Sequence, residues 1–345
     1  MSTFLITGGA GFFGSILKKE LVDKGNFCIS IDLENDDFKH KNFISIKGDI
    51  RDKKILNKIF KKYKFDAIFH CAALLAHEVK NKDDLWTSNV DGTKNIIEFA
   101  KQNKCKKILF ISSNCLWGEN FNKLVTEEEI PKPIEIYGKS KLEGEKLFFE
   151  NKDKINTIIF RSPTIIDEGR LGLLSLLFEF IDENRKVPMV GNGKNKYQFI
   201  YAKDLVNAMM LALSYNKTEI FNIGSDNVKT FNEVYEYVIK NANSKSKLFH
   251  FPKTFMTICM KICYILKISP LGPYQYKMIS SSFVFDTTKI KEKLNFSPTL
   301  SNEEMLLKSY NYYHKNRKEI ENRKNVSAHN KNAKMGIIRL LKWFM

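Results

Sequence analysis

The sequence predicts an α/β protein, in which a doubly wound parallel sheet is followed by a smaller, mainly helical lobe toward the C-terminus. Three observations support this prediction. Apolar and β-branched residues at 4–7 run into a glycine cluster at 8–14, and an amphipathic helical pattern follows. Short apolar strands then alternate with helical patterns across brief connections, which is typical of a parallel sheet with its ligand at the carboxyl ends of its strands. No low-complexity linker divides the first 300 of the 345 residues, a length that suffices for one large domain or two coupled lobes.

The glycine cluster predicts a strand, a tight turn and a helix that begins at the turn. Gly8 allows the turn, Gly11 lets the backbone approach a diphosphate, and Gly14 lets the helix lie close to the strand. Phe12 and Phe13 stand at the start of the helix, where N–H groups would receive the negative charge. The spacing is Gly-x-x-Gly-x-x-Gly, in contrast to the Gly-x-Gly-x-x-Gly of the older dinucleotide fingerprint.

The following elements fit the same plan. A strand over 27–31 ends at Asp32, about twenty residues past the glycines, where an acid suits the hydroxyls of an adenosine ribose. Its carboxylate would repel a 2′-phosphate, so NAD is favoured over NADP. The helix after the glycines is expected to keep Lys18 on its polar side, and Asp52 is expected to cap a helix over 53–62. Further strands are predicted at 43–46, 67–70 and 107–111.

Composition limits the class of function. The net charge of +17 indicates anionic partners, but the lysines are scattered and no basic-aromatic RNA motif is present, so nucleic acid is disfavoured. An anionic small substrate or an anionic membrane surface fits better. The six cysteines contain no Cys-x-x-Cys pair, which fits a reducing cytosol and no metal site. Met1 is followed almost at once by a strand and no apolar run spans a bilayer, so a cytoplasmic protein is expected.

Ten short segments carry a resemblance to a known family. They are residues 7–14, 32, 48–50, 70–73, 89–93, 112–118, 137–141, 161–164, 201–204 and 221–224. In this order, over roughly residues 3 to 300, the sequence resembles the extended short-chain dehydrogenase/reductase family, in its NAD-dependent sugar epimerase/dehydratase group. The resemblance implies an enzyme with a Rossmann-type fold and an NAD cofactor.

The resemblance also implies which residues hold the cofactor. Asp49 and Ile50 would flank the adenine, Ala72 and Ala73 would lie along the diphosphate and ribose, and Pro163 would lie near the nicotinamide. The complete expected set is Gly8, Gly11, Phe12, Phe13, Gly14, Asp32, Asp49, Ile50, Ala72, Ala73, Asn89, Tyr137, Lys141 and Pro163.

We expect a division into two lobes and a tail. The NAD-binding domain would comprise 1–165 and about 196–226, and the substrate-binding lobe about 166–195 and 227–312. Residues 313–345 are expected to form a basic tail that frays from a helix and ends in a short amphipathic helix at 335–345. That tail would contact an anionic membrane peripherally, stay disordered, or pack on a partner subunit.

Two further expectations concern partners. The apolar segments 171–181 and 252–268 would either pack within the lobe or form a greasy entrance for a lipid-linked substrate. Members of the family often form dimers through a bundle of helices. The helix that corresponds to the one carrying Tyr137 belongs to this bundle, so the resemblance implies a homodimer.

Tyr137, Lys141 and Ser113 form the expected catalytic set. Oxidising a secondary alcohol needs a base for the hydroxyl proton and an acceptor for the hydride, which are expected to be Tyr137 and NAD. A phenol titrates at about 10, but the ammonium of Lys141 one helical turn away favours the phenolate. By resemblance, Ser113 holds the substrate oxygen and Lys141 bonds the nicotinamide ribose. His70 is expected to be structural.

Departures from the family pattern narrow the reaction and the substrate. The 4,6-dehydratases carry an Asp-Glu pair where this sequence has Asn114 and Cys115, so dehydration is disfavoured. Tyr197 stands where many nucleotide-sugar enzymes have an arginine. The candidate substrate residues are Asn114, Arg170, Lys194, Lys196 and Tyr197.

The expected activity is the 4-epimerisation of a sugar on a nucleotide-diphosphate or polyprenyl-diphosphate carrier, in the assembly of surface polysaccharides. The segment Gly191-Asn192-Gly193-Lys194-Asn195 is also similar to members acting on 3β-hydroxysteroids. A sugar or steroid-type dehydrogenase is therefore an alternative, and an NAD-sensing scaffold protein is a third.

Overall fold

A computed structural model describes residues 1–75, 81–266, 268 and 271–323. Its main sheet has seven parallel strands in the order β10-β6-β5-β4-β1-β2-β3, with the crossover between β4 and β1 that is typical of a doubly wound sheet. The predicted α/β class is therefore confirmed. The strands are β1 (Thr3–Thr7), β2 (Phe27–Asp32), β3 (Phe43–Lys47), β4 (Ala67–His70), β5 (Lys107–Ser113), β6 (Asn156–Ser162) and β10 (Glu219–Asn222).

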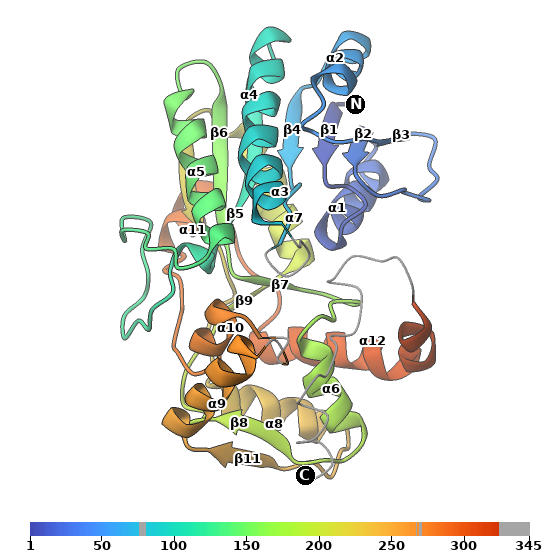
Figure 1. The fold of residues 1–345 in the computed structure, drawn as a ribbon. Coiled ribbons are helices and arrows are strands. Elements are labelled where there is room, and N and C mark those ends of the chain that lie inside the picture. Colours follow the sequence, from blue (N-terminus) through green and yellow to red (C-terminus); the bar gives the residue numbers. More distant parts are fainter. Residues whose placement is uncertain (76–80, 267, 269–270, 324–345) are drawn as a thin grey trace.

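Helices cover both faces of this sheet (Figure 1). One core cluster joins the sheet to α1 (Phe12–Asp23), α7 (Ala202–Leu211) and α11 (Thr288–Leu294). The other joins it to α2 (Lys53–Lys62), α4 (Gly92–Gln102) and α5 (Ile136–Glu150). Asp52 caps α2 as predicted, because its carboxylate accepts hydrogen bonds from the backbone N–H groups of Lys54 and Ile55.

The smaller lobe lies beyond the carboxyl ends of the strands, in the lower half of Figure 1. Its core joins three helices: α6 (Leu174–Asp182), α8 (Phe231–Asn241) and α12 (Asn302–Asn322). Two parallel strand pairs accompany them, β7 (Thr164–Ile166) with β9 (Phe199–Tyr201), and β8 (Val187–Val190) with β11 (Leu248–Phe251). The lobe also carries α9 (Lys253–Ile265) and α10 (Pro273–Met278).

Short segments complete the description. The remaining elements are α3 (Lys82–Trp86), the π-helical turn η1 (Thr87–Asp91), and the 3₁₀ turns η2 (Asn114–Leu116) and η3 (Ala212–Ser214). No helix among the described residues is both long and apolar enough to cross a bilayer.

Two predicted boundaries differ from the structure. The predicted lobe segment 227–312 includes α11, yet Ile290 and Leu294 pack into the core beneath the sheet. The predicted tail begins at 313, but α12 continues to Asn322, and Tyr313 and Ile320 are buried in the core of the lobe. The lobe therefore extends past 313 because the apolar face of α12 continues through a polar, lysine-rich sequence. The predicted helix at 335–345 falls outside the described residues.

Candidate active site

The glycine loop between β1 and α1 has the shape that a dinucleotide diphosphate needs. Gly8 has a φ of +77°, and a Cβ there would lie 2.8 Å from the backbone of Ala72 on the neighbouring strand end. A Cβ at Gly14 would lie 2.1 Å from the Gly8 carbonyl oxygen. Gly11 precedes the first helical residue, and within the described part of the chain no side chain caps α1 through a hydrogen bond at this position. A helix N-terminus attracts an anion, so the loop fits the diphosphate of the cofactor.

Asp32 ties the end of β2 to this loop. One carboxylate oxygen accepts a 2.9 Å hydrogen bond from the backbone N–H of Ala10, and the other a 3.0 Å bond from that of Glu34. The acid expected to bind the adenosine ribose therefore also fixes the glycine loop.

The two residues expected around the adenine, Asp49 and Ile50, both contact other parts of the protein. Burial would raise the pKa of Asp49, but hydrogen bonds and charge from Arg51 outweigh this and lower it. Ile50 is buried against Gly92, where an added Cβ would lie 2.6 Å from the isoleucine side chain. Ile50 thus packs the loop onto α4.

Lys18, expected on the polar side of α1, is buried beneath the glycine loop. Its ammonium lies 2.5 Å from Asp36 Oδ1 and donates a 3.1 Å hydrogen bond to the Gly9 carbonyl oxygen. The rings of Phe38 and Phe43 flank the charge at 5.3 and 5.5 Å. The sequence carried a signal for this position, because Lys18 lies four residues after the inward-facing Gly14.

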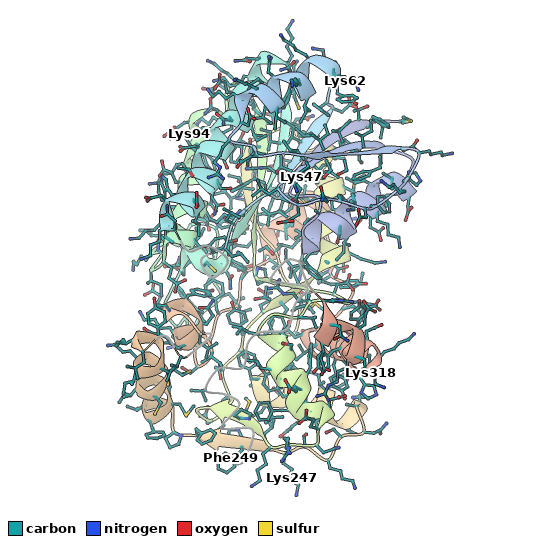
Figure 2. The ribbon with its side chains drawn as sticks, turned by 45° about the vertical axis from the view of Figure 1, so that its right-hand side comes forward. Lys47, Lys62, Lys94, Lys247, Phe249 and Lys318 are labelled. Carbon is teal, nitrogen blue, oxygen red and sulfur yellow. The ribbon has the colours of Figure 1, made fainter. Side chains whose placement is uncertain are left out.

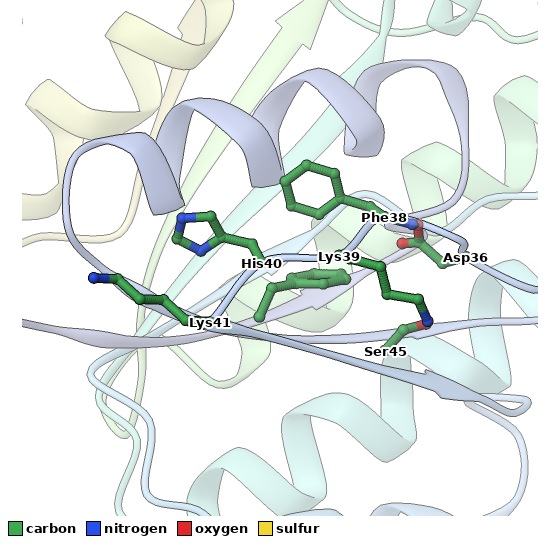
Figure 3. Close-up of a pocket in the computed structure, with 7 residues that line it drawn as sticks. Asp36, Phe38, Lys39, His40, Lys41 and Ser45 are labelled. Carbon is green, nitrogen blue, oxygen red and sulfur yellow. The ribbon is translucent and has the colours of Figure 1, made fainter.

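A surface hollow of about 460 Å³ lies beside this pair, over β3 on the side of α1 (Figure 3). Its lining comes from the segment between β2 and β3 and from β3 itself, and Phe38 stacks on His40 there. The hollow is separate from the expected catalytic residues, which stand on β5 and α5.

The three expected catalytic residues stand on two adjoining elements. Ser113 ends β5, and its hydroxyl accepts a 3.1 Å hydrogen bond from the backbone N–H of Cys115. Tyr137 lies in the first turn of α5 and Lys141 one turn later. A Cβ at Gly138 would lie 2.1 Å from the Cys115 carbonyl oxygen, so α5 begins directly against the turn that follows Ser113.

The buried ammonium of Lys141 joins α5 to β5. It donates a 2.8 Å hydrogen bond to the Ile111 carbonyl oxygen and lies 5.9 Å from the centroid of the Tyr137 ring. Burial lowers the pKa of Lys141 to about 8, and nearby Cys71 and Glu145 oppose the shift. The ammonium is therefore the main form at neutral pH and lies close to the phenol.

His70 is structural, as expected. Its two ring nitrogens lie 2.7 and 2.8 Å from the hydroxyls of Thr7 and Thr93. Burial, and secondarily the charge of Lys141, lower the pKa of His70 to about 3. The ring is thus neutral at physiological pH and links three elements below the cofactor loop.

Asn89 and Pro163 support the backbone around the site. The Asn89 side chain bonds both the N–H and the carbonyl of Leu74, at 2.8 and 3.0 Å, and donates to the Ser140 hydroxyl at 3.0 Å. It thereby holds the segment after Ala72 and Ala73 against α5. Pro163 is buried after β6, and its carbonyl accepts a hydrogen bond from the Ser162 hydroxyl.

A buried ion pair that sequence reasoning missed lies behind the catalytic elements. Arg161 on β6 lies 2.8 Å from Glu145 on α5, and both side chains are 4% exposed. The Ser112 hydroxyl donates a 2.6 Å hydrogen bond to the same carboxylate. The pair therefore joins α5, β5 and β6, and fixes the helix that carries Tyr137.

The substrate side brings together two expected residues and one that was missed. Asn114 donates a 2.6 Å hydrogen bond to the Tyr197 hydroxyl, which lies 3.3 Å from the hydroxyl of Tyr274 on α10. Burial raises the pKa of Tyr197 and of Tyr274, so both phenols stay protonated at neutral pH. Tyr274 was missed because it lies far along the chain in an element without a family motif.

The expected cationic residues are placed differently from one another. The Arg170 guanidinium lies 5.6 Å from the centroid of Phe12, at the N-terminus of α1 and therefore against the glycine loop. Lys194 and Lys196 are exposed on the loop after β8. Among the described residues, no group of three or more His, Cys, Asp or Glu side chains could hold a metal ion.

Comparison with known proteins identifies the family. The model of the NAD dependent epimerase/dehydratase family matches residues 4–224. An uncharacterized protein of Sinorhizobium fredii is 32% identical over 343 residues, which cover 99% of this chain and 86% of the relative. A putative UDP-glucose 4-epimerase of Methanocaldococcus jannaschii is 32% identical over 251 residues, 68% of this chain and 80% of that relative.

Solved structures share the fold. A UDP-glucose 4-epimerase of Thermotoga maritima with UDP-glucose has a TM-score of 0.76 at 24% identity, covering 91% of this chain and 99% of its own. The enzyme WbmG of Bordetella bronchiseptica in complex with NAD has a TM-score of 0.75 at 18% identity, covering 91% and 94%. Because the family match covers the glycine loop, β5 and α5, this chain is an enzyme of the NAD-dependent epimerase/dehydratase family, and its cofactor is NAD.

Proposed function

We propose that the protein is an epimerase that inverts a hydroxyl-bearing carbon, at position 4, of a sugar carried on a diphosphate. The observation that carries this proposal is the buried Lys141 ammonium, bonded to the end of β5 and one helical turn from Tyr137. The relatives named as UDP-glucose 4-epimerases support the choice of reaction and of a nucleotide-diphosphate sugar.

In this proposal Tyr137 takes the hydroxyl proton and later returns it. The nearby positive charge of Lys141 favours the phenolate form, and Ser113 orients the substrate oxygen toward that phenol. The glycine loop and Lys141 would hold NAD, which would supply a hydride acceptor beside the same carbon. Inversion requires that the keto sugar turn over, so that the hydride returns to its opposite face and no cofactor is consumed. Tyr137 is thus the base in one direction and the acid in the other.

Asn114 favours epimerisation over dehydration. Its amide is held by the Tyr197 hydroxyl at 2.6 Å and has no titratable group that could eliminate water. Burial raises the pKa of the neighbouring Cys115 thiol to about 11, so this side chain is neutral at pH 7. Neither residue replaces the acid pair of a dehydratase, although dTDP-D-glucose 4,6-dehydratases are among the relatives, such as the human enzyme at 26% identity.

The test is incubation of the purified protein with UDP-glucose, UDP-galactose and their N-acetyl forms, followed by chromatographic separation of the epimers. The proposal predicts an epimer mixture from either partner of a pair, with no net change of absorbance at the wavelength of reduced NAD. A net rise in that absorbance, with release of an oxidised sugar, would instead identify a dehydrogenase.

Substitution of Tyr137 by Phe tests whether this residue transfers the proton. The variant should lose about 10²-fold or more of the turnover, because proton transfer typically contributes 10²–10⁴-fold, and should still bind NAD. Tyr63→Phe, at the end of α2, is the matched control and should retain full activity. Turnover that survives in Tyr137→Phe would remove this residue from the mechanism.

A further inference from the structure

Helix α9 carries an apolar face that no other described part of the chain covers. Its inward side includes the buried Met260, whereas the outward side chains are between 50% and 66% exposed. Their spacing of three and four residues places them along one side of the helix. They are Phe255, Ile258, Ile262, Ile265 and Leu266. Soluble proteins rarely leave so continuous an apolar face exposed without an interaction to serve.

The segment of the chain around this face is basic. Residues 237–285, which contain α9, include seven lysines and no aspartate or glutamate. Lys261 is exposed on α9 itself, and Lys253 begins the helix. At the far end of the lobe, the neighbouring strand β11 is flanked by Lys247 and carries the exposed Phe249, both pointing outward in Figure 2. An occupant of the α9 face would therefore carry negative charge around an apolar centre.

A second copy of the chain fits this charge poorly. An isologous contact would bring each α9 against its own counterpart, so that the lysines of the two copies would face one another around the apolar centre. The C-terminal segment of this chain fits no better. Residues 324–345 contain five lysines and arginines and no acidic residue, and like charges would oppose its packing on α9.

An anionic bilayer surface matches both features. Apolar side chains of an interfacial helix enter the boundary between headgroups and acyl chains, while lysines at its edge reach the phosphates. Each lysine near an anionic surface contributes about a fivefold gain in binding, the equivalent of ~1 kcal/mol. With 13 residues, α9 is too short to span a bilayer but long enough to lie along its surface.

We infer that α9 docks the substrate lobe on an anionic lipid bilayer, with Phe255, Ile258, Ile262, Ile265 and Leu266 as its buried face and Lys261 at its edge. This inference does not rest on the proposed reaction, because it is argued from the exposure of the α9 side chains and from the charge around them. It has one consequence for the site. α9 packs against α10, and Tyr274 on α10 lies within hydrogen-bond distance of Tyr197. The docked helix would therefore contact the element that carries one of the expected substrate-side residues' partners.

The test is co-sedimentation of the full-length protein with phosphatidylglycerol vesicles and with phosphatidylcholine vesicles. The wild type should sediment with the anionic vesicles only, and less at high salt. The Ile258→Ser/Ile262→Ser variant should bind about tenfold more weakly, and Lys261→Gln about fivefold more weakly. Ile130→Ser is the matched control, because Ile130 is 71% exposed on the other domain, and it should bind like the wild type.

A variant of the C-terminal segment separates the two basic regions. Leu341→Ser/Phe344→Ser leaves α9 intact, so it should retain binding that the α9 variant loses. Three results would overturn the inference. They are no binding of the wild type to anionic vesicles, equal binding of the wild type and the α9 variant, and a lower oligomeric mass of the α9 variant in light scattering without vesicles. The last result would identify the face as a contact between copies.

Discussion

Lys141 donates a 2.8 Å hydrogen bond to the carbonyl oxygen of Ile111, although only 3% of this lysine is exposed. A buried ammonium is costly, and here the cost appears as a pKa lowered to about 8. The protein therefore maintains an unfavourable charge close to Tyr137. Such a charge is expected where a group serves a reaction at the expense of stability.

Replacing Lys141 by Met should change how stability depends on pH. Below pH 8 the lysine is protonated in both the folded and the unfolded state, so burying its ammonium lowers the stability by the full amount. Between the folded pKa of about 8 and the model value of 10.5, the unfolded state binds more protons, so the wild type gains stability as pH rises. From pH 7 to above the higher pKa, the wild type should gain up to about 3 kcal/mol relative to Lys141→Met.

Chemical denaturation at several pH values measures this difference. Lys139→Met is the control, because Lys139 is exposed on the same helix. If the difference in unfolding free energy between wild type and Lys141→Met were constant across this pH range, burial would not lower the pKa of Lys141.

The Lys18–Asp36 pair should be needed for both stability and cofactor binding. Lys18→Met leaves Asp36 buried without its partner, which typically costs about 3–5 kcal/mol. The same change removes the donor to the Gly9 carbonyl, so NAD should bind about tenfold more weakly, as expected for a lost charge-assisted hydrogen bond. Fluorescence titration with NAD measures the affinity.

A double variant separates the two effects. Lys18→Met/Asp36→Leu should recover part of the stability, because no unpaired charge remains, but should keep the weak NAD binding. Wild-type affinity in the double variant would mean that Lys18 does not position the glycine loop.

Acid should destabilise the protein partly through His70. Its folded pKa of about 3 lies below the model value of 6.5, so the unfolded state binds more protons between these values. Stability is therefore lost as pH falls from 6.5, by up to about 5 kcal/mol from this residue. His70→Gln should flatten the dependence measured by denaturation at pH 6.5 to 4, and His250→Gln, at an exposed position, is the comparison variant. Equal slopes in both variants would contradict a neutral buried imidazole.

The end of α12 should behave as core. Ile320 is 2% exposed, so Ile320→Ala should destabilise the protein by about 2–4 kcal/mol, the usual cost of such a buried truncation. Lys315→Ala, at an exposed position on the same helix, should cost less than about 0.5 kcal/mol. If both changes had the same small effect in thermal or chemical unfolding, the predicted boundary at 313 would be the better description.

Local patterns in the sequence were enough to predict the sheet and the cofactor loop. Asp52 caps residues that follow it within three positions, so its role is visible locally. The apolar run before Gly8 and the acid at Asp32 follow from the repeat of strand, helix and strand. The i, i+4 spacing of Tyr137 and Lys141 likewise predicted their common face, which the 5.9 Å approach confirms.

Contacts between distant segments could not be predicted in this way. The partners Glu145–Arg161 and Tyr197–Tyr274 are ordinary residues in sequence, and only the packed fold brings them together. The end of α12 was misplaced for a different reason. Its many lysines and asparagines made the segment look polar throughout, so the apolar face that continues through Tyr313 to Ile320 was not recognised.

The central claim is that Tyr137 acts as a phenolate favoured by the ammonium of Lys141. Ultraviolet difference titration of the NAD-loaded protein, wild type minus Tyr137→Phe, measures that single phenol among all the tyrosines. The account predicts one phenolate that titrates below the ~10 of an ordinary tyrosine and shifts upward in Lys141→Met. A midpoint at or above the ordinary value, or one that is unchanged in Lys141→Met, would contradict it.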